Sequence, residues 1–185
     1  MQTVNIEIAD ELMKALKNKV RVKARGVYHV EHIRNGEVIH TQEVDNIVVD
    51  EGLNHMLDVA LSNGSQNSTW YLGIYKNNYT PVAGNTASTF AGAGVANEIS
   101  SEVDETTRPI WTEAGASAKS ITNSASPAVF TANTTVAAYG AFLISNATMG
   151  GTTGVLMSAA KFAAVRNLVD TDVLNVTYTL TIADA

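Results

Sequence analysis

The closing run Asp172-Val-Leu-Asn-Val-Thr-Tyr-Thr-Leu-Thr-Ile182 decides the fold. Apolar residues alternate in it with asparagine and threonine, and this period of two is typical of a half-buried β-strand. The apolar face consists of Leu174, Val176, Tyr178, Leu180 and Ile182. A strand of this length needs hydrogen-bonding partners on both sides, so the run predicts a β-sheet with the terminal strand inside it.

The composition limits the kinds of protein that the chain can be. Its 185 residues suffice for one domain with a core plus an N-terminal arm. Charged residues make up only 16% of the chain and aromatic residues 6%. Ser, Thr, Asn and Gly are common in place of charged residues, and such a composition suits a β-protein. The absence of cysteine excludes disulfides, a thiol nucleophile and cysteine-bound metal.

The N-terminus shows no charged-then-apolar signal pattern. No apolar run approaches the roughly 18 residues of a membrane span. We therefore expect no membrane insertion and no export by a recognisable signal.

The first 25 residues are predicted to form a basic helical arm. Residues 8–19 place Ile8, Leu12, Ala15 and Leu16 at helical spacing, with acids early and lysines late. This single apolar stripe must pack on something. Half of the chain's 12 basic residues then follow one another without an acid: Lys14, Lys17, Lys19, Arg21, Lys23 and Arg25.

Two interpretations of this basic run remain open. It can be an arm that docks on an acidic surface or on phosphates. It can equally be a solvated helix end followed by the outer face of a strand. Direct nucleic-acid contact is not expected, because no aromatic residues interleave to stack on bases.

A long β-hairpin is predicted over residues 26–49. Its turn is Asn35-Gly36, the pair best suited to a type I′ turn because both positions need positive φ. The two-residue turn predicts the cross-strand pairs Arg34–Glu37, Ile33–Val38, Glu31–His40 and Val27–Val44.

A helix is predicted over residues 50–62. Leu53, Met56, Leu57, Ala60 and Leu61 are spaced by three and four. We expect Asp50 to cap the start and Asn63-Gly64 to end the helix.

Short apolar strands separated by turn signals follow the helix, at 70–75, 128–131, 136–144 and the terminal run. Residues 156–165 would also suit a helix, but we favour a strand because Thr152, Thr153 and Gly154 begin a helix badly. Residues 76–96 are expected to form loops that contact something outside the domain. The predicted fold is mainly β: residues 26–185 form an antiparallel, jelly-roll-like β-sandwich with an N-terminal helix, a long hairpin and one further helix.

No catalytic, cofactor or metal site is predicted. His29 and His32 lie three apart and therefore on opposite faces of a strand, so they are poor joint ligands, and His40 is better explained as a cross-strand partner. The acids Glu98, Glu102, Asp104 and Glu105 lack the spacing of a calcium loop, and we interpret them as a solvated acidic loop.

Several stretches together resemble a family of small, β-rich, non-enzymatic virion proteins of tailed bacteriophages. They are Gly36–Ile39, Asn46–Leu57, Trp70–Ile74, Thr107–Trp111, Ser120–Thr131 and Gly150–Met157. The resemblance implies a place in the virion, with assembly in the cytoplasm of the host bacterium, and carries over no catalytic residues.

Within that class, we expect first a capsid decoration or cement protein that stabilises the shell. It would bind the major capsid protein as a homo-oligomer, with a trimer favoured. The first alternative is a neck, collar or tail-fibre adaptor that binds neck or tail proteins. The second alternative is a receptor- or carbohydrate-binding module with aromatic stacking platforms, although these rings are more simply explained as core: Trp70, Tyr71, Tyr75, Tyr79 and Trp111.

Overall fold

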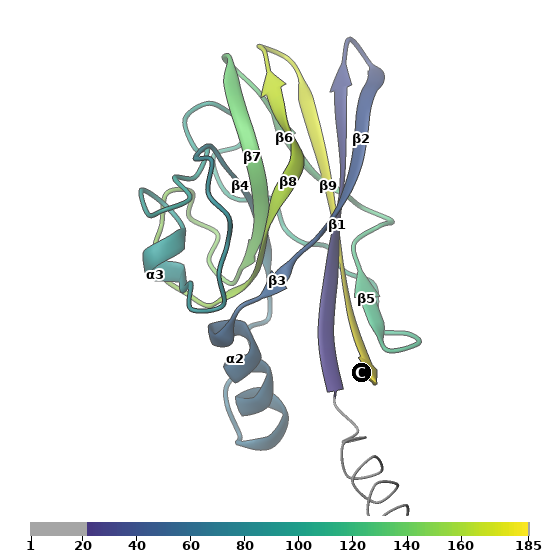
Figure 1. The fold of residues 1–185 in the computed structure, drawn as a ribbon, viewed down its shortest axis with the longest axis vertical. Coiled ribbons are helices and arrows are strands. Elements are labelled where there is room, and N and C mark those ends of the chain that lie inside the picture. Colours follow the sequence, from purple (N-terminus) through teal and green to yellow (C-terminus); the bar gives the residue numbers. More distant parts are fainter. Residues whose placement is uncertain (1–21, 185) are drawn as a thin grey trace, which may run out of the picture.

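The computed structural model describes residues 22–184 of the chain. In this part the chain folds into two antiparallel sheets and two helices (Figure 1). The strands are β1 (Val22–Arg34), β2 (Glu37–Asp45), β3 (Ile47–Val48), β4 (Tyr71–Tyr75), β5 (Ser120–Thr122), β6 (Ala128–Thr131), β7 (Val136–Ile144), β8 (Leu156–Leu168) and β9 (Val173–Asp184), and the helices are α2 (Asp50–Leu61) and α3 (Ala87–Phe90). The predicted antiparallel β-sandwich is confirmed, including the strand at 156–165; the predicted helix over 8–19 lies outside the described residues.

The terminal strand β9 is at the centre of the first sheet. The order of that sheet is β2-β1-β9-β5, and β6 pairs with β9 on the same side as β5. All of β1 except its last residue lies antiparallel to β9, from Val22 opposite Asp184 to Ile33 opposite Val173. The second sheet has the order β3-β8-β7-β4. The first strand of the chain is therefore held in place by the last.

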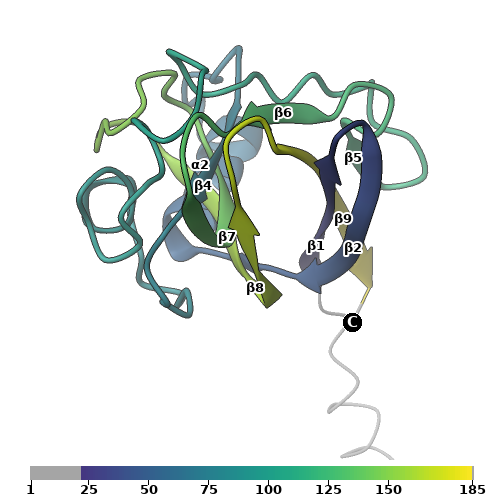
Figure 2. The same ribbon diagram turned by 90° about the horizontal axis from the view of Figure 1, so that it is seen from above.

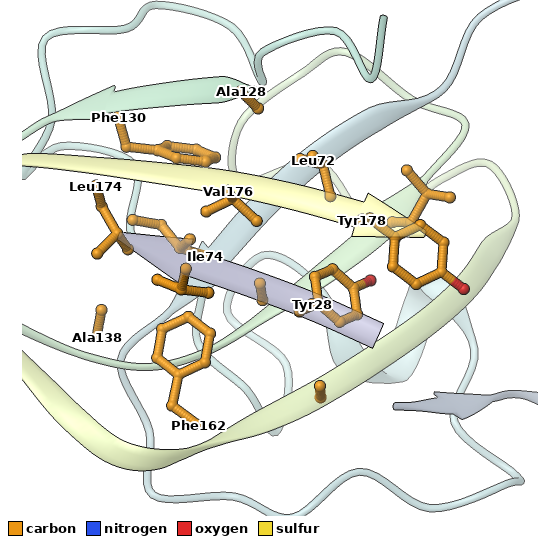
Figure 3. Packing of buried hydrophobic residues seen from close by; sticks show 14 of the residues in the cluster. Tyr28, Leu72, Ile74, Ala128, Phe130, Ala138, Phe162, Leu174, Val176 and Tyr178 are labelled. Carbon is orange, nitrogen blue, oxygen red and sulfur yellow. The ribbon is translucent and has the colours of Figure 1, made fainter. Parts of the chain in front are cut away.

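The main core lies between the two sheets. Leu174, Val176 and Tyr178 of β9 are fully buried, as the alternation predicts. Figure 3 shows Leu174 and Val176 on the side of Ile74 and Phe162 of the other sheet, and Tyr178 beside Tyr28. Seen from above, the sheets curve around this shared core (Figure 2). Inside it, the rings of Tyr28 and Tyr178 lie 4.5 Å apart.

The loops at 76–96 cover the outer face of the second sheet. Phe90 of α3 is fully buried there, and its ring lies 5.5 Å from that of Tyr75 and 5.6 Å from that of Phe142. This sheet is thus buried on both faces, which explains the nearly continuous apolar run of β7. Residues 76–96 pack on the domain itself, at least through α3.

The hairpin contains a β-bulge that the sequence analysis did not predict. Pairing is as predicted next to the turn, with Arg34 opposite Glu37 and Ile33 opposite Val38, but the register shifts between His32 and Ile33. As a result His40 lies opposite His32, not Glu31, and Val44 lies opposite Tyr28, not Val27.

Burial explains why the bulge is present. Residues directly opposite each other point to the same side of a sheet. Without the extra residue, Glu43 would share the buried side with Tyr28, and Val44 would face water. One inserted residue reverses both positions.

Helix α2 packs on the second sheet through a close backbone contact. A Cβ atom added to Gly52 would lie 2.5 Å from the carbonyl oxygen of Met157 in β8, so glycine allows the helix to approach. The helix ends before Asn63, as predicted, with the amides of Ser62 and Gly64 donating to the carbonyl of Asp58. The predicted cap is wrong: the N-cap residue is Val49, and Asp50 is the first helical residue.

At two places where a strand lacks a neighbouring strand, a side-chain amide forms hydrogen bonds with its backbone groups. Between β5 and β6, the buried Asn123 accepts a hydrogen bond from the Tyr178 amide at 2.7 Å and donates to the Val176 carbonyl at 3.3 Å. Where β2 meets β8, Gln42 donates to the Ala164 carbonyl and accepts from the Ala164 amide, each at 3.0 Å. Backbone groups of both sheets are satisfied in this way.

Candidate functional site

Two of the six predicted docking residues lie in the described part of the chain. Lys23 and Arg25 are exposed and lie two apart on β1, so both point to its outer face. Arg25 approaches the Asp45 carboxylate at 3.7 Å, but both side chains are solvated, and a pair of this kind contributes little to stability. Lys14, Lys17, Lys19 and Arg21 lie outside the described residues.

Strand β1 is continuous from Val22 to Arg34 and therefore crosses the predicted boundary between residues 25 and 26. Lys23 and Arg25 are opposite Ala183 and Thr181 of β9. The last part of the predicted basic arm is thus an ordered strand of the sandwich.

The start of β1 and helix α2 lie at the same end of the molecule (Figure 1). The amide of Asn46 donates to the carbonyl of Gly26 at 3.0 Å, and Val22 and Asp50 each lie four residues from this hydrogen bond along the chain. We call this region, formed by residues 22–25 and α2, the α2 end.

Three leucines are exposed on α2. Leu53 is 36% exposed, Leu57 57% and Leu61 82%, and their spacing of four places them along one side of the helix. We call them the leucine stripe. Gly52 is the one residue between Asp50 and Leu61 that is buried. The apolar face of α2 is thus only partly covered by the described residues.

A groove of about 210 Å³ separates α2 from the loop before β4. His55 lies in it with its ring 5.6 Å from that of Trp70, edge to face, and its Nε2 is 3.0 Å from the Asn67 amide nitrogen. Mostly apolar side chains line the groove: His55, Met56, Val59, Gln66, Asn67, Trp70 and Met157. It is suited to an apolar group with a few polar contacts.

The other aromatic residues considered as stacking platforms do not gather on one surface. Trp111 is in the main core and donates from Nε1 to the Tyr178 carbonyl at 3.1 Å. Tyr75 is fully buried, and its hydroxyl donates to the Ala160 carbonyl at 3.1 Å. Among the five rings, Trp70 is the one that lines the groove.

His29 and His32 lie on opposite faces of β1. His29 points outward, 3.3 Å from a carboxylate oxygen of Glu43, whereas His32 is buried. Among residues 22–184, no three histidine, aspartate or glutamate side chains are placed to hold a metal ion.

His40 is partly enclosed beside His32. Its Nε2 is buried and makes no hydrogen bond with a described residue. Removal from water lowers the pKa of His40, and the nearby Arg166 and His32 lower it further.

Asp172 is at the centre of a polar cluster that includes His32 and Arg34. Its carboxylate accepts hydrogen bonds from Arg34 Nε at 2.8 Å and Nη2 at 2.7 Å, from the Val169 amide at 2.8 Å and from His32 Nε2 at 2.9 Å. The two bonds from Arg34 are the main reason why the pKa of Asp172 lies well below its ordinary value. The cluster joins the hairpin to the turn between β8 and β9.

The interpretation of Glu98 as part of a solvated acidic loop is wrong. Its carboxylate is buried and forms a two-pronged salt bridge with the buried Arg108, at 2.7 Å for both hydrogen bonds. Arg108 also donates to the carbonyls of Asn146 and Gly151 at 2.8 Å. This pair fixes the loop between β7 and β8 to the segment before β5.

The neighbouring acids are also held by structural contacts. Glu102 lies 2.6 Å from Lys76 Nζ, and although burial alone would raise the pKa of Glu102, Lys76 lowers it. Glu105 accepts from the Thr131 amide at 3.0 Å. Asp104 is exposed.

Glu51 was not considered in the sequence analysis but holds three elements together. Its Oε2 accepts from the Ala87 amide of α3 at 2.8 Å and from the Leu156 amide of β8 at 2.7 Å. It lies beside the predicted cap position, yet nothing in the sequence pattern indicates these distant partners.

No protein-family model matches the chain, and no curated protein is significantly similar to it. Within residues 22–184, neither helix has the length and apolar character needed to cross a membrane. The α2 end, with its exposed basic residues, leucine stripe and groove, remains the candidate interaction site.

Proposed function

We propose that the protein is a non-enzymatic structural protein of a bacteriophage virion, and specifically a capsid decoration protein that stabilises the shell. The carrying observation is that Lys23 and Arg25 are exposed on the outer face of β1, where they continue the run of basic residues that precedes them. The family resemblance of the hairpin, the β3–α2 region and the later strands supports the same class.

The sandwich serves this function as a rigid body with one docking end. The outer face of β1, with Lys23 and Arg25, faces an acidic surface of the shell, and oligomer formation, with a trimer favoured, multiplies the contacts. Attraction between unlike charges accelerates association, while buried interface area supplies most of the affinity. The shell is stabilised by mass action, because the protein binds assembled shell in preference to free subunits.

Rebinding to particles tests the docking end. Particles stripped of the protein are mixed with full-length chain in which Lys23 and Arg25 are replaced by glutamine, in 50 and 500 mM salt. We expect the wild type to bind more weakly in high salt, because exposed charges are screened, and the double variant to bind more weakly in low salt.

Lys161→Gln, in β8, is the matched control and should bind as the wild type does. Binding that is insensitive both to salt and to the loss of Lys23 and Arg25 would contradict docking by the outer face of β1. Circular dichroism of each variant confirms that the sandwich is intact.

An adaptor of the neck, collar or tail fibre remains the first alternative, because a connector ring can also present an acidic surface. The two functions differ in abundance: a decoration protein approaches the copy number of the capsid protein, and an adaptor is far scarcer.

Carbohydrate binding is favoured by one specific observation, the position of Trp70 beside Asn67 and Gln66 in the groove. Aromatic rings with neighbouring amides are suited to sugars. Glycan-array binding that Trp70→Ala abolishes would favour this alternative.

A further inference from the structure

The charges on the outer face of the first sheet are ordered along β1. Lys23 and Arg25, at the start of the strand, are exposed, and the side chain of Glu31, near its end, is 34% exposed. Residues two apart on a strand point to the same side, so all three share the outer face with Val27 and His29. A basic half of the strand is therefore followed by an acidic half.

The neighbouring strands reinforce this order. On β2, Glu43 lies opposite His29 and Asp45 lies opposite Val27, and their side chains are 71% and 76% exposed. Residues directly opposite each other point to the same side of a sheet. On β9, the residues opposite the outward residues of β1 carry no charge: Asn175, Thr177, Thr179, Thr181 and Ala183. We call the titratable residues of this surface the charged face: Lys23, Arg25, His29, Glu31, Glu43 and Asp45.

The charged face is arranged symmetrically about Val27. Lys23 precedes Val27 by four residues and Glu31 follows it by four, so each lies about 13 Å from it along the strand. Arg25 precedes Val27 by two residues. His29 follows it by two and lies 3.3 Å from a carboxylate oxygen of Glu43. Reversing the direction of the strand therefore exchanges the positions of the basic and the acidic groups.

We infer that the charged face binds the same face of a second copy of this chain, about a two-fold axis that passes over Val27 and across the strands. The two β1 strands then run in opposite directions. Lys23 of each copy meets Glu31 of the other, and Arg25 meets the pair of His29 and Glu43. A second copy thus presents both signs of charge in the required order, whereas a uniformly acidic partner matches only the basic half.

Asp45 is the one charged group close to the axis. The Asp45 side chains of the two copies approach each other there, and each is accompanied by Arg25 of its own chain at 3.7 Å. The other central residues are uncharged: Val27 of β1 and Thr179, which lies opposite it on β9. The remaining charges lie toward the rim of the contact, where charged groups are common in protein interfaces.

The pairing concerns the free protein and does not rest on the proposed place in a virion. It covers Lys23 and Arg25, so a paired copy cannot dock through them on a shell at the same time. Self-association therefore competes with docking. Rebinding to particles and self-association are measured separately, so the failure of one proposal is distinguishable from the failure of the other.

Exchange of charges tests the pairing in sedimentation equilibrium of the full-length chain. We expect the wild type to form dimers as its concentration rises, and fewer dimers in high salt because the charges are screened. Lys23→Glu and Glu31→Lys should each raise the dissociation constant about tenfold, since the symmetry of the dimer replaces two attractive contacts by two repulsive ones. Both changes in one chain should restore the dissociation constant to within about twofold of the wild type, because every contact is re-formed with its signs exchanged.

Lys161→Glu, in β8 of the second sheet, is the matched control. It changes the net charge as Lys23→Glu does and should leave self-association unchanged. A wild type that stays monomeric at every concentration would overturn the inference. So would a double variant that associates as weakly as the single variants, or a larger oligomer that neither reversal affects. Circular dichroism verifies that each variant is folded.

Discussion

At the scale of single residues, Asp172 links the chain's last turn to its first hairpin. The side chain of Asp172 is 1% exposed and that of Arg34 38%. Loss of one partner from a fully buried pair costs roughly 3–5 kcal/mol, and the exposure of Arg34 places the cost here below that range. We expect Asp172→Asn to lower the free energy of unfolding by about 2 kcal/mol at neutral pH.

The pH dependence of stability identifies this contribution. The pKa of Asp172 is depressed in the folded state. As the pH falls through about 4, Asp172 becomes protonated in the unfolded chain but stays ionised in the folded protein. The free energy of unfolding therefore decreases. Urea unfolding between pH 3 and 7 should show a shallower acid loss for Asp172→Asn than for the wild type. The exposed Asp170→Asn is the control, and equal slopes for wild type and Asp172→Asn would contradict the assignment.

Gln42 provides a second test at this scale. Glutamate has the same shape but cannot donate to the Ala164 carbonyl, so we expect Gln42→Glu to cost about 1–2 kcal/mol. Hydrogen exchange of the Ala164 amide should accelerate as well. Glu43→Gln, at the exposed neighbouring position, should change neither quantity, and unchanged exchange in Gln42→Glu would show that the amide does not close the edge.

The sequence predicted the buried face of β9 from Leu174 to Leu180 because strict alternation reports burial directly, but Ile182 on the same predicted face is 42% exposed. It could not predict the partners of Glu98, Asp172 or Glu51. Asp172 and Glu51 are satisfied by residues far away in sequence, such as Asp172 by Arg34. Glu98 pairs with Arg108 across an irregular segment that has no periodic pattern to predict the contact. Asp172 nevertheless lies inside the stretch that decides the fold.

At the scale of elements, Gly52 decides how α2 meets the second sheet. Alanine would gain about 1 kcal/mol in helix propensity, but its Cβ would lie 2.5 Å from a carbonyl oxygen of β8, which cannot move aside easily. We expect Gly52→Ala to destabilise the protein by roughly 1–3 kcal/mol in urea unfolding. Asn54→Ala, on the exposed part of the helix, should be neutral or slightly stabilising. A stabilised Gly52→Ala would show that the helix is not held at this contact.

Elements with strong local signals were predictable. The turn at Asn35-Gly36, the end of α2 and the strand nature of β8 follow from local chemistry. The bulge in the hairpin does not follow from local chemistry. It is present because it buries Val44 and leaves Glu43 exposed. Burial depends on the opposite sheet, which the local pattern does not contain.

At the scale of the whole molecule, we expect the pairing of β1 with β9 to limit the folding rate. The first sheet cannot close until residues at the two ends of the chain meet. Non-local pairing of this kind is slow, and we expect refolding in milliseconds to seconds. Stopped-flow tryptophan fluorescence of a Trp70→Phe variant, in which the buried Trp111 is the remaining tryptophan, measures it. Complete refolding within microseconds would mean that this pairing does not limit the reaction.

The order of the strands in the two sheets could not be predicted from the sequence. Alternation in β9 indicated that it needs partners, but not that the N-terminal hairpin supplies one of them. The candidate site has the same limit. The basic run was visible in the sequence, whereas the fold is needed to place Lys23 and Arg25, at the start of β1, at the same end of the molecule as α2.

The proposed function requires the chain to be present in purified phage particles, and its copy number there tests the proposal most directly. Quantitative mass spectrometry gives the ratio of this chain to the major capsid protein, and electron cryomicroscopy gives its position. A decoration protein predicts a ratio close to one and density on the outer shell. Absence of the chain from intact particles would contradict a structural role in the virion, and a few copies at a single vertex would contradict decoration in favour of an adaptor.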